Sequence, residues 1–254
     1  MSLNSVRYGC TSLLGVNKAG ELKQDDNGYY EMIVGGLDVY NSAGQLYVFE
    51  EAKKLFEESS SLMRRVKRGV LRGEYGHPKL QPGMRMEDFM ARALVIDEQL
   101  CCCHHREIWL DFDRVKDENG KPVIAIMSKV APSGPFGAAL EKSLNNPNEN
   151  VCFSIRGFTD DYRENGITKR ILKQIITWDY VNEPGISHAE KYKSPSLESL
   201  DEQVVFKNQL ETAVTRIKSA NDAVASESIL LTTDELMASM GWRIQGKKPS
   251  YLNW

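Results

Sequence analysis

The sequence predicts an α+β protein, in which helices pack on a strand-rich domain and a helical tail follows. Runs rich in β-branched and aromatic residues, bounded by Gly, Pro and Asn, are typical of strands. Segments with apolar residues at helical spacing lie between these runs and after them. After Pro184 the chain turns polar, as linkers do. We therefore expect an N-terminal segment (1–27), a main domain (28–190), and a linker with a helical tail (191–254).

The expected elements follow from these patterns in chain order. Residues 1–27 are polar and turn-rich and give no interpretable signal. Beyond them, strand and helix patterns alternate, and the turn DENGK joins two of the strands. We expect strands over 29–40, 99–113, 122–130, 150–158 and 167–181 with a short one after Gly69, and helices over 42–69, 85–94, 136–144 and 204–222 with a short one near Thr233.

The composition excludes several classes of function. The formal net charge is -3, from 32 Lys+Arg against 35 Asp+Glu, so the chain has no bulk attraction to nucleic acid or to an anionic membrane. No apolar run reaches the length of about 18 residues that spans a bilayer. The first residues lack the pattern of a signal peptide. We expect a soluble cytoplasmic protein whose five cysteines are reduced.

A cluster of three cysteines and two histidines covers residues 101–105. In a strand, Cys101, Cys103 and His105 would share one face, and Cys102 and His104 the other. A zinc site normally gathers its ligands from two separated segments, and the sequence offers no second pair of ligands. We therefore expect packing cysteines, no bound metal and no cofactor, although a metal or redox domain remains an alternative.

Ser154 is the most distinctive candidate nucleophile, because it lies in the middle of the apolar strand pattern NVCFSIRGF. Two interpretations of this hydroxyl are open from the residues alone. It is either a buried serine bonded to the backbone or a nucleophile. In the second case Arg156, together with backbone amides held open by Gly157, would stabilise an oxyanion.

Five short motifs follow one another along the chain: RGEYGHP (72–78), HHREIWLDF (104–112), APSGPFGAALEKSL (131–144), VCFSIRGF (151–158) and WDYVNEP (178–184). Together they resemble the prohead maturation proteases of tailed phages, which are relatives of the herpesvirus assemblins. The proteases of very large phages, the phiKZ type, look most similar. The resemblance extends over roughly residues 66–190, and it implies a β-barrel surrounded by helices. The expected fold is thus an assemblin-like barrel followed by the helical tail.

The resemblance also implies a catalytic group. The nucleophile of the protease family aligns with Ser154. The general base of the family aligns with His104, and His105 is the second choice. Asp179 follows the serine by 25 residues and would orient the base. The remaining two candidates, His77 and Glu74, belong to the G-E-x-G-H-P motif and would shape or complete the site.

The implied activity is that of a serine endopeptidase that cleaves capsid, scaffold and internal core proteins inside the immature prohead, in the host cytoplasm. Cleavage would follow glutamate in motifs with a small or aliphatic residue two positions earlier. Self-cleavage after Glu198 or Glu227 would then release the tail. Association into a homo-oligomer is also expected. Candidates for a basic pocket that binds the glutamate are Arg156, Lys169, Arg170 and Lys173.

A second hypothesis is a non-enzymatic scaffold or core protein with the same fold. It needs no serine–histidine geometry, and its full-length chain would be stable. Two interpretations of the tail helix are open: it docks onto scaffold or capsid protein inside the immature shell, or it is a plain terminal helix that packs on the domain.

Overall fold

The structure, a computed structural model, describes residues 5–14, 24–41, 44–116, 121–146, 148–181, 203–219 and 232–242. It contains two β-sheets with helices around them, and the predicted α+β class is confirmed. The closed barrel is not confirmed, because the strands of the described residues form two separate sheets and neither closes on itself.

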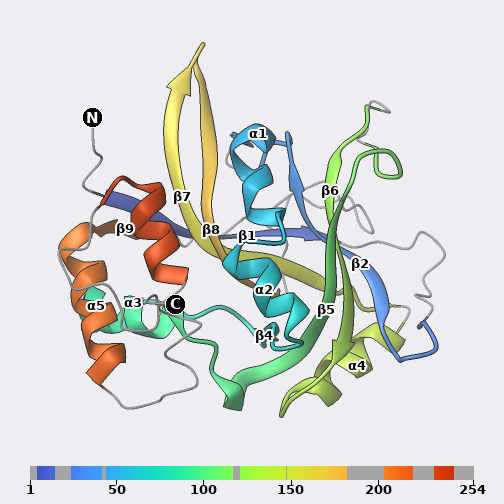
Figure 1. The fold of residues 1–254 in the computed structure, drawn as a ribbon. Coiled ribbons are helices and arrows are strands. Elements are labelled where there is room, and N and C mark those ends of the chain that lie inside the picture. Colours follow the sequence, from blue (N-terminus) through green and yellow to red (C-terminus); the bar gives the residue numbers. More distant parts are fainter. Residues whose placement is uncertain are drawn as a thin grey trace, which may run out of the picture.

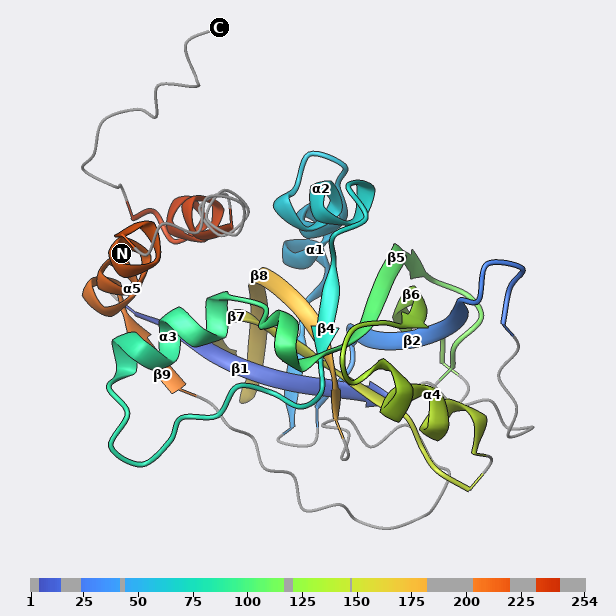
Figure 2. The same ribbon diagram turned by 90° about the horizontal axis from the view of Figure 1, so that it is seen from below.

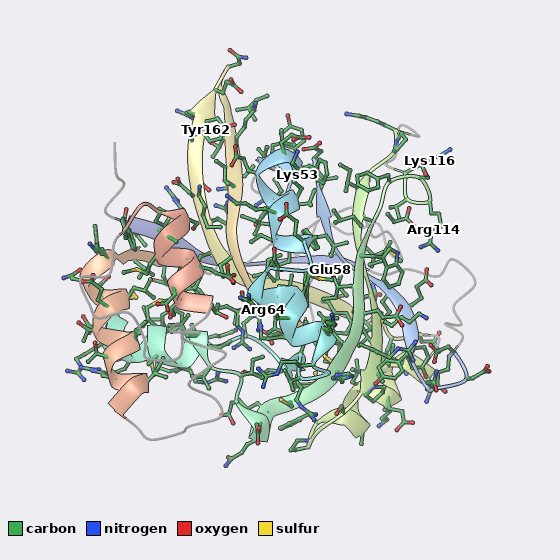
Figure 3. The ribbon with its side chains drawn as sticks, viewed as in Figure 1. Lys53, Glu58, Arg64, Arg114, Lys116 and Tyr162 are labelled. Carbon is green, nitrogen blue, oxygen red and sulfur yellow. The ribbon has the colours of Figure 1, made fainter. Side chains whose placement is uncertain are left out.

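The first sheet has five strands in the order β3-β8-β7-β1-β9. Only the β3–β8 pair is parallel. Strands β7 and β8 form a long hairpin that extends away from the body, with Tyr162 near its tip (Figures 1 and 3). Its two-residue turn is Asn165-Gly166, whose positive φ angles suit this sequence. The strands are β1 (Ser5–Leu14), β3 (Gln45–Tyr47), β7 (Cys152–Glu164), β8 (Ile167–Val181) and β9 (Gln203–Phe206).

The second sheet has four antiparallel strands in the order β2-β6-β5-β4. It carries the cysteine–histidine cluster at the start of β5. Its first member, β2, packs against β1 and β7 of the other sheet. The strands are β2 (Tyr30–Leu37), β4 (Arg72–Glu74), β5 (Cys101–Asp111) and β6 (Ile124–Pro132).

The helices lie in three places around the sheets. Figure 2 shows α3, α5 and a helix over residues 232–239 gathered at one end of the molecule, α4 at the other, and α1 and α2 on one side between them. None of the helices in the described parts of the chain is long and apolar enough to cross a membrane. The helices are α1 (Phe49–Ala52), η1 (Lys53–Phe56), α2 (Ser61–Lys67), α3 (Met86–Leu94), η2 (Glu98–Leu100), α4 (Gly137–Asn145) and α5 (Lys207–Ser219).

Two apolar clusters cover opposite faces of the five-stranded sheet. The main core lies between the sheets and includes Phe153 and Trp178. The second core lies on the outer face, where Phe158 and Ile176 meet α3, α5, β9 and the helix over 232–239. The described parts of the predicted tail therefore pack on the sheet, because β9 pairs with β1 and α5 contacts α3.

Three segments differ from the sequence prediction. The uninterpreted stretch 1–27 contains β1, an inner strand of the five-stranded sheet. The single helix expected over 42–69 is instead β3 followed by α1, η1 and α2, because the side chain of Ser60 caps a new helix start at its end. The helix expected over 204–222 begins only at Lys207, because the residues before it pair with β1.

Candidate active site

Strand pairing places Ser154 beside Asp179. The two residues are direct cross-strand partners in β7 and β8, so their side chains share one face of the sheet. Their chain neighbours Phe153 and Trp178 point to the main core, so Ser154 and Asp179 point to the outer face. Both side chains are buried, and Asp179 has an exposed fraction of 0%.

A β-bulge in β8 gives Asp179 this orientation. Arg156 pairs with Thr177 and Gly157 pairs with Ile175, which leaves Ile176 as the extra residue. Ile175 faces the main core, and regular alternation would turn Asp179 toward the main core as well. The bulge reverses the alternation and places the carboxylate next to Ser154.

Arg65 of α2 holds this bulge. Its guanidinium donates hydrogen bonds to the carbonyls of Ile175 (2.9 Å) and Ile176 (2.5 Å). The side chain is buried, and burial lowers the pKa of Arg65 to about 10. Two carbonyls that the bulge would leave unpaired in the interior are thereby satisfied.

The Asp179 carboxylate binds three groups from two elements. Nδ1 of His77 lies 2.8 Å from Oδ2, and the backbone N–H of Glu74 donates to Oδ1 over 2.8 Å. Arg156 donates to both oxygens, at 2.8 and 2.7 Å. Since Glu74 ends β4 and His77 lies in the loop that follows it, this segment is held against β8 at two points. The imidazole is mostly buried, with 14% of the side chain exposed.

Arg156 is fully buried, and all three of its guanidinium nitrogens have partners. Beyond the Asp179 carboxylate, it donates to the carbonyls of Ala93 and Val95 and forms an ion pair with Glu74 at 3.0 Å. The sequence analysis predicted that this guanidinium stabilises an oxyanion or binds the glutamate of a substrate. The structure engages it within the protein instead.

Glu74 links this network to helix α3. Its carboxylate accepts two hydrogen bonds from Nη1 and Nη2 of Arg92, at 3.0 and 2.5 Å, and one from the backbone N–H of Asp97 at 2.7 Å. The Glu74 side chain is 1% exposed, against 28% for Arg92.

Two glycines permit close approach of backbone around the site. A Cβ at Gly73 would overlap the carbonyl oxygen of Trp178 and lie 2.7 Å from Sγ of Cys103. At Gly157, a Cβ would overlap the carbonyl oxygen of Gln174. Gly157 therefore allows β8 to bulge toward β7, whereas the sequence prediction gave it the role of opening an oxyanion site.

The predicted base, His104, and the second choice, His105, lie elsewhere. His104 binds the Tyr29 hydroxyl through Nδ1 (3.0 Å) and the Gly69 carbonyl through Nε2 (2.9 Å). His105 points into the main core, where its ring nitrogens bind the Ser128 hydroxyl (3.0 Å) and the Trp178 carbonyl (3.2 Å). The structure brings His77 to Asp179, and it brings neither of the paired histidines to Ser154.

The electrostatics of the buried groups follow from their partners. Burial alone would raise the pKa of Asp179, but the charge of Arg156 and the hydrogen bond with His77 outweigh it and hold the pKa below its usual range. Burial lowers the pKa of His105 to about 4, so that imidazole is neutral near pH 7. Burial also lowers the pKa of His104.

The cysteines of β5 behave as packing residues. Cys101, Cys102 and Cys103 are buried free thiols, and burial raises the pKa of Cys101 to about 11. Buried thiols of raised pKa are poor nucleophiles and poor metal ligands. Within the described ranges, no three His, Cys, Asp or Glu side chains lie close enough to hold a metal ion.

The other predicted residues are not gathered at this site. Arg170 is buried against Asp161 on the β7–β8 hairpin, and Lys169 forms an ion pair with Glu164 near its turn. Lys173 lies on the same strand, and its charge acts on Asp160. The proposed cleavage positions Glu198 and Glu227 lie outside the described residues.

Sequence reasoning missed Arg65 and Arg92 and gave His77 an accessory place. The G-E-x-G-H-P motif was a usable signal for His77, because a motif with both Glu and His ahead of a proline-punctuated loop is unusual. A histidine bound to a buried carboxylate, next to a serine on the same face, provides the components of nucleophilic acyl transfer.

The chain is similar to known proteins over most of its length. The model of the Peptidase S80 family matches residues 8–237. The capsid maturation protease of Pseudomonas phage phiKZ is 37% identical over 252 residues, which cover 96% of this chain and 92% of the relative. Among solved structures, the capsid assembly protease of bacteriophage T4 is similar with a TM-score of 0.48 and 14% identity, over 70% of this chain and 98% of that one. The resemblance to phage maturation proteases is thus confirmed, and the chain belongs to the Peptidase S80 family.

Proposed function

We propose that this chain is a capsid maturation protease that cleaves peptide bonds through an acyl-enzyme on Ser154. The observation that carries the proposal is the His77–Asp179 contact of 2.8 Å beside the serine. Membership of a peptidase family and the name of the phiKZ relative support the protease activity.

In the proposed mechanism, His77 is the general base. Asp179 binds Nδ1, so Nε2 is the nitrogen that takes the proton of the Ser154 hydroxyl as its oxygen attacks the peptide carbonyl. The same nitrogen then returns the proton to the leaving amine. Water next attacks the acyl-enzyme, with His77 again as base, and the second product leaves as a carboxylate.

Access to Ser154 is part of this mechanism. The residue is 2% exposed, so a peptide reaches the hydroxyl only after a covering segment moves. The rate at which a small serine-directed reagent acylates Ser154 would report this opening separately from peptide cleavage.

The proposed substrates are capsid and internal core proteins inside the immature prohead, by analogy with the named relative. We further propose cleavage after glutamate with a small or aliphatic residue two positions earlier, which includes self-cleavage after Glu198 and Glu227. Cleavage after Glu227 would detach the helix over 232–239. That helix is docked on α2, where Glu235 accepts a hydrogen bond from the Ser61 N–H and pairs with Arg64 at 2.6 Å (Figure 3).

The test is mass spectrometry of the purified wild-type chain beside Ser154→Ala, each incubated at high concentration. We expect the wild type to lose its tail after Glu198 or Glu227 while the variant stays whole. If neither chain is trimmed and neither cleaves added core protein, the scaffold hypothesis is favoured. If both are trimmed alike, a contaminating host protease made the cuts and the proposal fails.

A further inference from the structure

We infer that Glu74 and Arg92 are positioning residues that act through Arg156 to set the proton affinity of His77. The inference deepens the proposed function and rests on it, since it concerns the base of that mechanism. It is carried by a chain of buried ion pairs that begins at helix α3 and ends at the imidazole.

The chain of contacts is continuous. Arg92 donates hydrogen bonds to both carboxylate oxygens of Glu74, and Oε1 of Glu74 lies 3.0 Å from Nη2 of Arg156. The same Nη2 donates to Asp179 at 2.7 Å, and Asp179 binds His77 at 2.8 Å. Four charged side chains therefore stand in series, with alternating sign, before the base is reached.

The four charges balance. Arg92 and Arg156 are cations, and Glu74 and Asp179 are anions, so the network is neutral while the imidazole is neutral. Three of the four side chains are exposed by 1% or less, so water screens their interactions weakly. Protonation of His77 adds an unbalanced positive charge to this buried group.

The balance decides how strongly His77 holds a proton. A buried aspartate with no other partner would favour the imidazolium strongly and keep the base charged near neutral pH. Arg156 opposes that effect because it shares both oxygens of Asp179. Glu74 in turn offsets the charge of Arg156, and Arg92 offsets Glu74. The sign of the effect on His77 should therefore alternate along the chain.

Other titratable groups face this network and keep their charge state near neutral pH. Cys103 and His105 on β5 both interact with the Asp179 charge, and burial keeps the thiol and that imidazole neutral. Arg65 of α2, a buried cation, also interacts with Arg156, and its own charge is offset by Glu235. The charged and titratable groups around the base, by element, are Tyr8 of β1, Arg65 of α2, Glu74 of β4, Arg92 of α3, Cys103 and His105 of β5, Arg156 of β7 and Asp179 of β8.

The experiment measures the His77 pKa directly. The chain has 4 histidines, so NMR of the imidazole carbons in histidine-labelled protein gives four titration curves, and His77→Gln assigns one of them. Ser154→Ala serves as the background, because it prevents self-cleavage during the titration. The variants are Glu74→Gln, Arg92→Gln and the double variant. Arg85→Gln is the control, because Arg85 is an exposed arginine before the same helix that pairs only with Asp88 among the contacts of the described residues.

The expected shifts have opposite signs. Glu74→Gln leaves an unbalanced cation and should lower the His77 pKa by about half a unit or more. Arg92→Gln leaves an unbalanced anion and should raise it by a similar amount. The double variant should titrate near the Ser154→Ala background, and Arg85→Gln should not shift. Shifts of the same sign in both single variants, or none, would overturn the inference.

The pH profile of kcat/KM separates this inference from the proposed function. With an active serine, the acid limb of Glu74→Gln should move to lower pH with the NMR curve, which gives roughly threefold higher activity below the limb for half a unit. If the NMR curves shift as expected but the acid limbs do not, the network sets the His77 pKa and His77 is not the base. If the curves do not shift, the inference fails whatever the activity shows.

Discussion

The substitution Asp179→Asn removes the charge that both Arg156 and His77 bind, and its cost follows from the burial of the site. The asparagine amide is neutral, so Arg156, which is 0% exposed, keeps only the Glu74 carboxylate as an ionic partner. Loss of one partner of a buried ion pair typically costs about 3–5 kcal/mol. For a chain of this length such a loss lowers Tm by roughly 6–20 °C. An asparagine also stabilises the wrong imidazole tautomer, so activity per folded molecule should fall on the order of a thousandfold or more.

The matched control is Asp161→Asn. Asp161 binds Arg170 through two hydrogen bonds of 3.0 and 2.9 Å, and Arg170 is also 0% exposed. This pair lies on the same β7–β8 hairpin but apart from Ser154. The stability loss should be comparable, while the activity of the folded fraction stays near that of the wild type.

The assay combines thermal unfolding with peptide cleavage at a temperature where both variants are at least nine-tenths folded. Equal activity per folded molecule in Asp179→Asn and Asp161→Asn would refute a catalytic place for Asp179. An unchanged Tm in Asp179→Asn would refute the reasoning about the buried pair.

Three further predictions concern the supports of the site. Gly73→Ala should lower the free energy of unfolding, measured with urea, by about 2 kcal/mol or more, and it should lower activity. The reason is that the added Cβ overlaps the Trp178 carbonyl and pushes β4 from β8. Normal stability would contradict the close packing. Arg65→Met should lower the free energy of unfolding by about 2 kcal/mol or more and reduce kcat, since the bulge that turns Asp179 loses its two hydrogen bonds. A loss of stability with unchanged kcat would show that the bulge persists without them. His105 has a pKa of about 4 in the folded protein, against an ordinary value of 6.5, so the unfolded state binds the proton first. The free energy of unfolding should therefore fall by about 3 kcal/mol as pH drops from about 6.5 to about 4. His105→Gln should lack this slope, and a slope that survives in it would contradict the assignment.

The hairpin that carries the site was predictable because its signal is local. Both strands around Ser154 and Asp179 are rich in β-branched and aromatic residues, and the predicted strands 150–158 and 167–181 lie within β7 and β8 or differ from them only at their ends. The bulge at Ile176 was not predictable, because it exists only in the register between two strands and depends on Arg65 from a distant helix.

The identity of the proposed base depends on contacts that sequence order does not reveal. His77 and Asp179 are 102 residues apart in the sequence. Strand alternation places His104 and His105 on opposite faces of their strand, and it does not show which of the two faces Ser154. The residues of β1 were missed for a related reason. Their partners in β7 and β9 are far along the chain, so neither strand gives a local pairing signal at the N-terminus.

The proposed catalytic group of Ser154, His77 and Asp179 is tested most directly by exchanging the histidines one at a time. The measurement compares kcat/KM of His77→Gln and His104→Gln for cleavage of one core-protein peptide, with Ser154→Ala as the blank and Tm as the check on folding. The account predicts that His77→Gln falls to within about tenfold of the blank, while His104→Gln keeps activity within about tenfold of the wild type. Loss of activity in a folded His104→Gln, with His77→Gln still active, would contradict it.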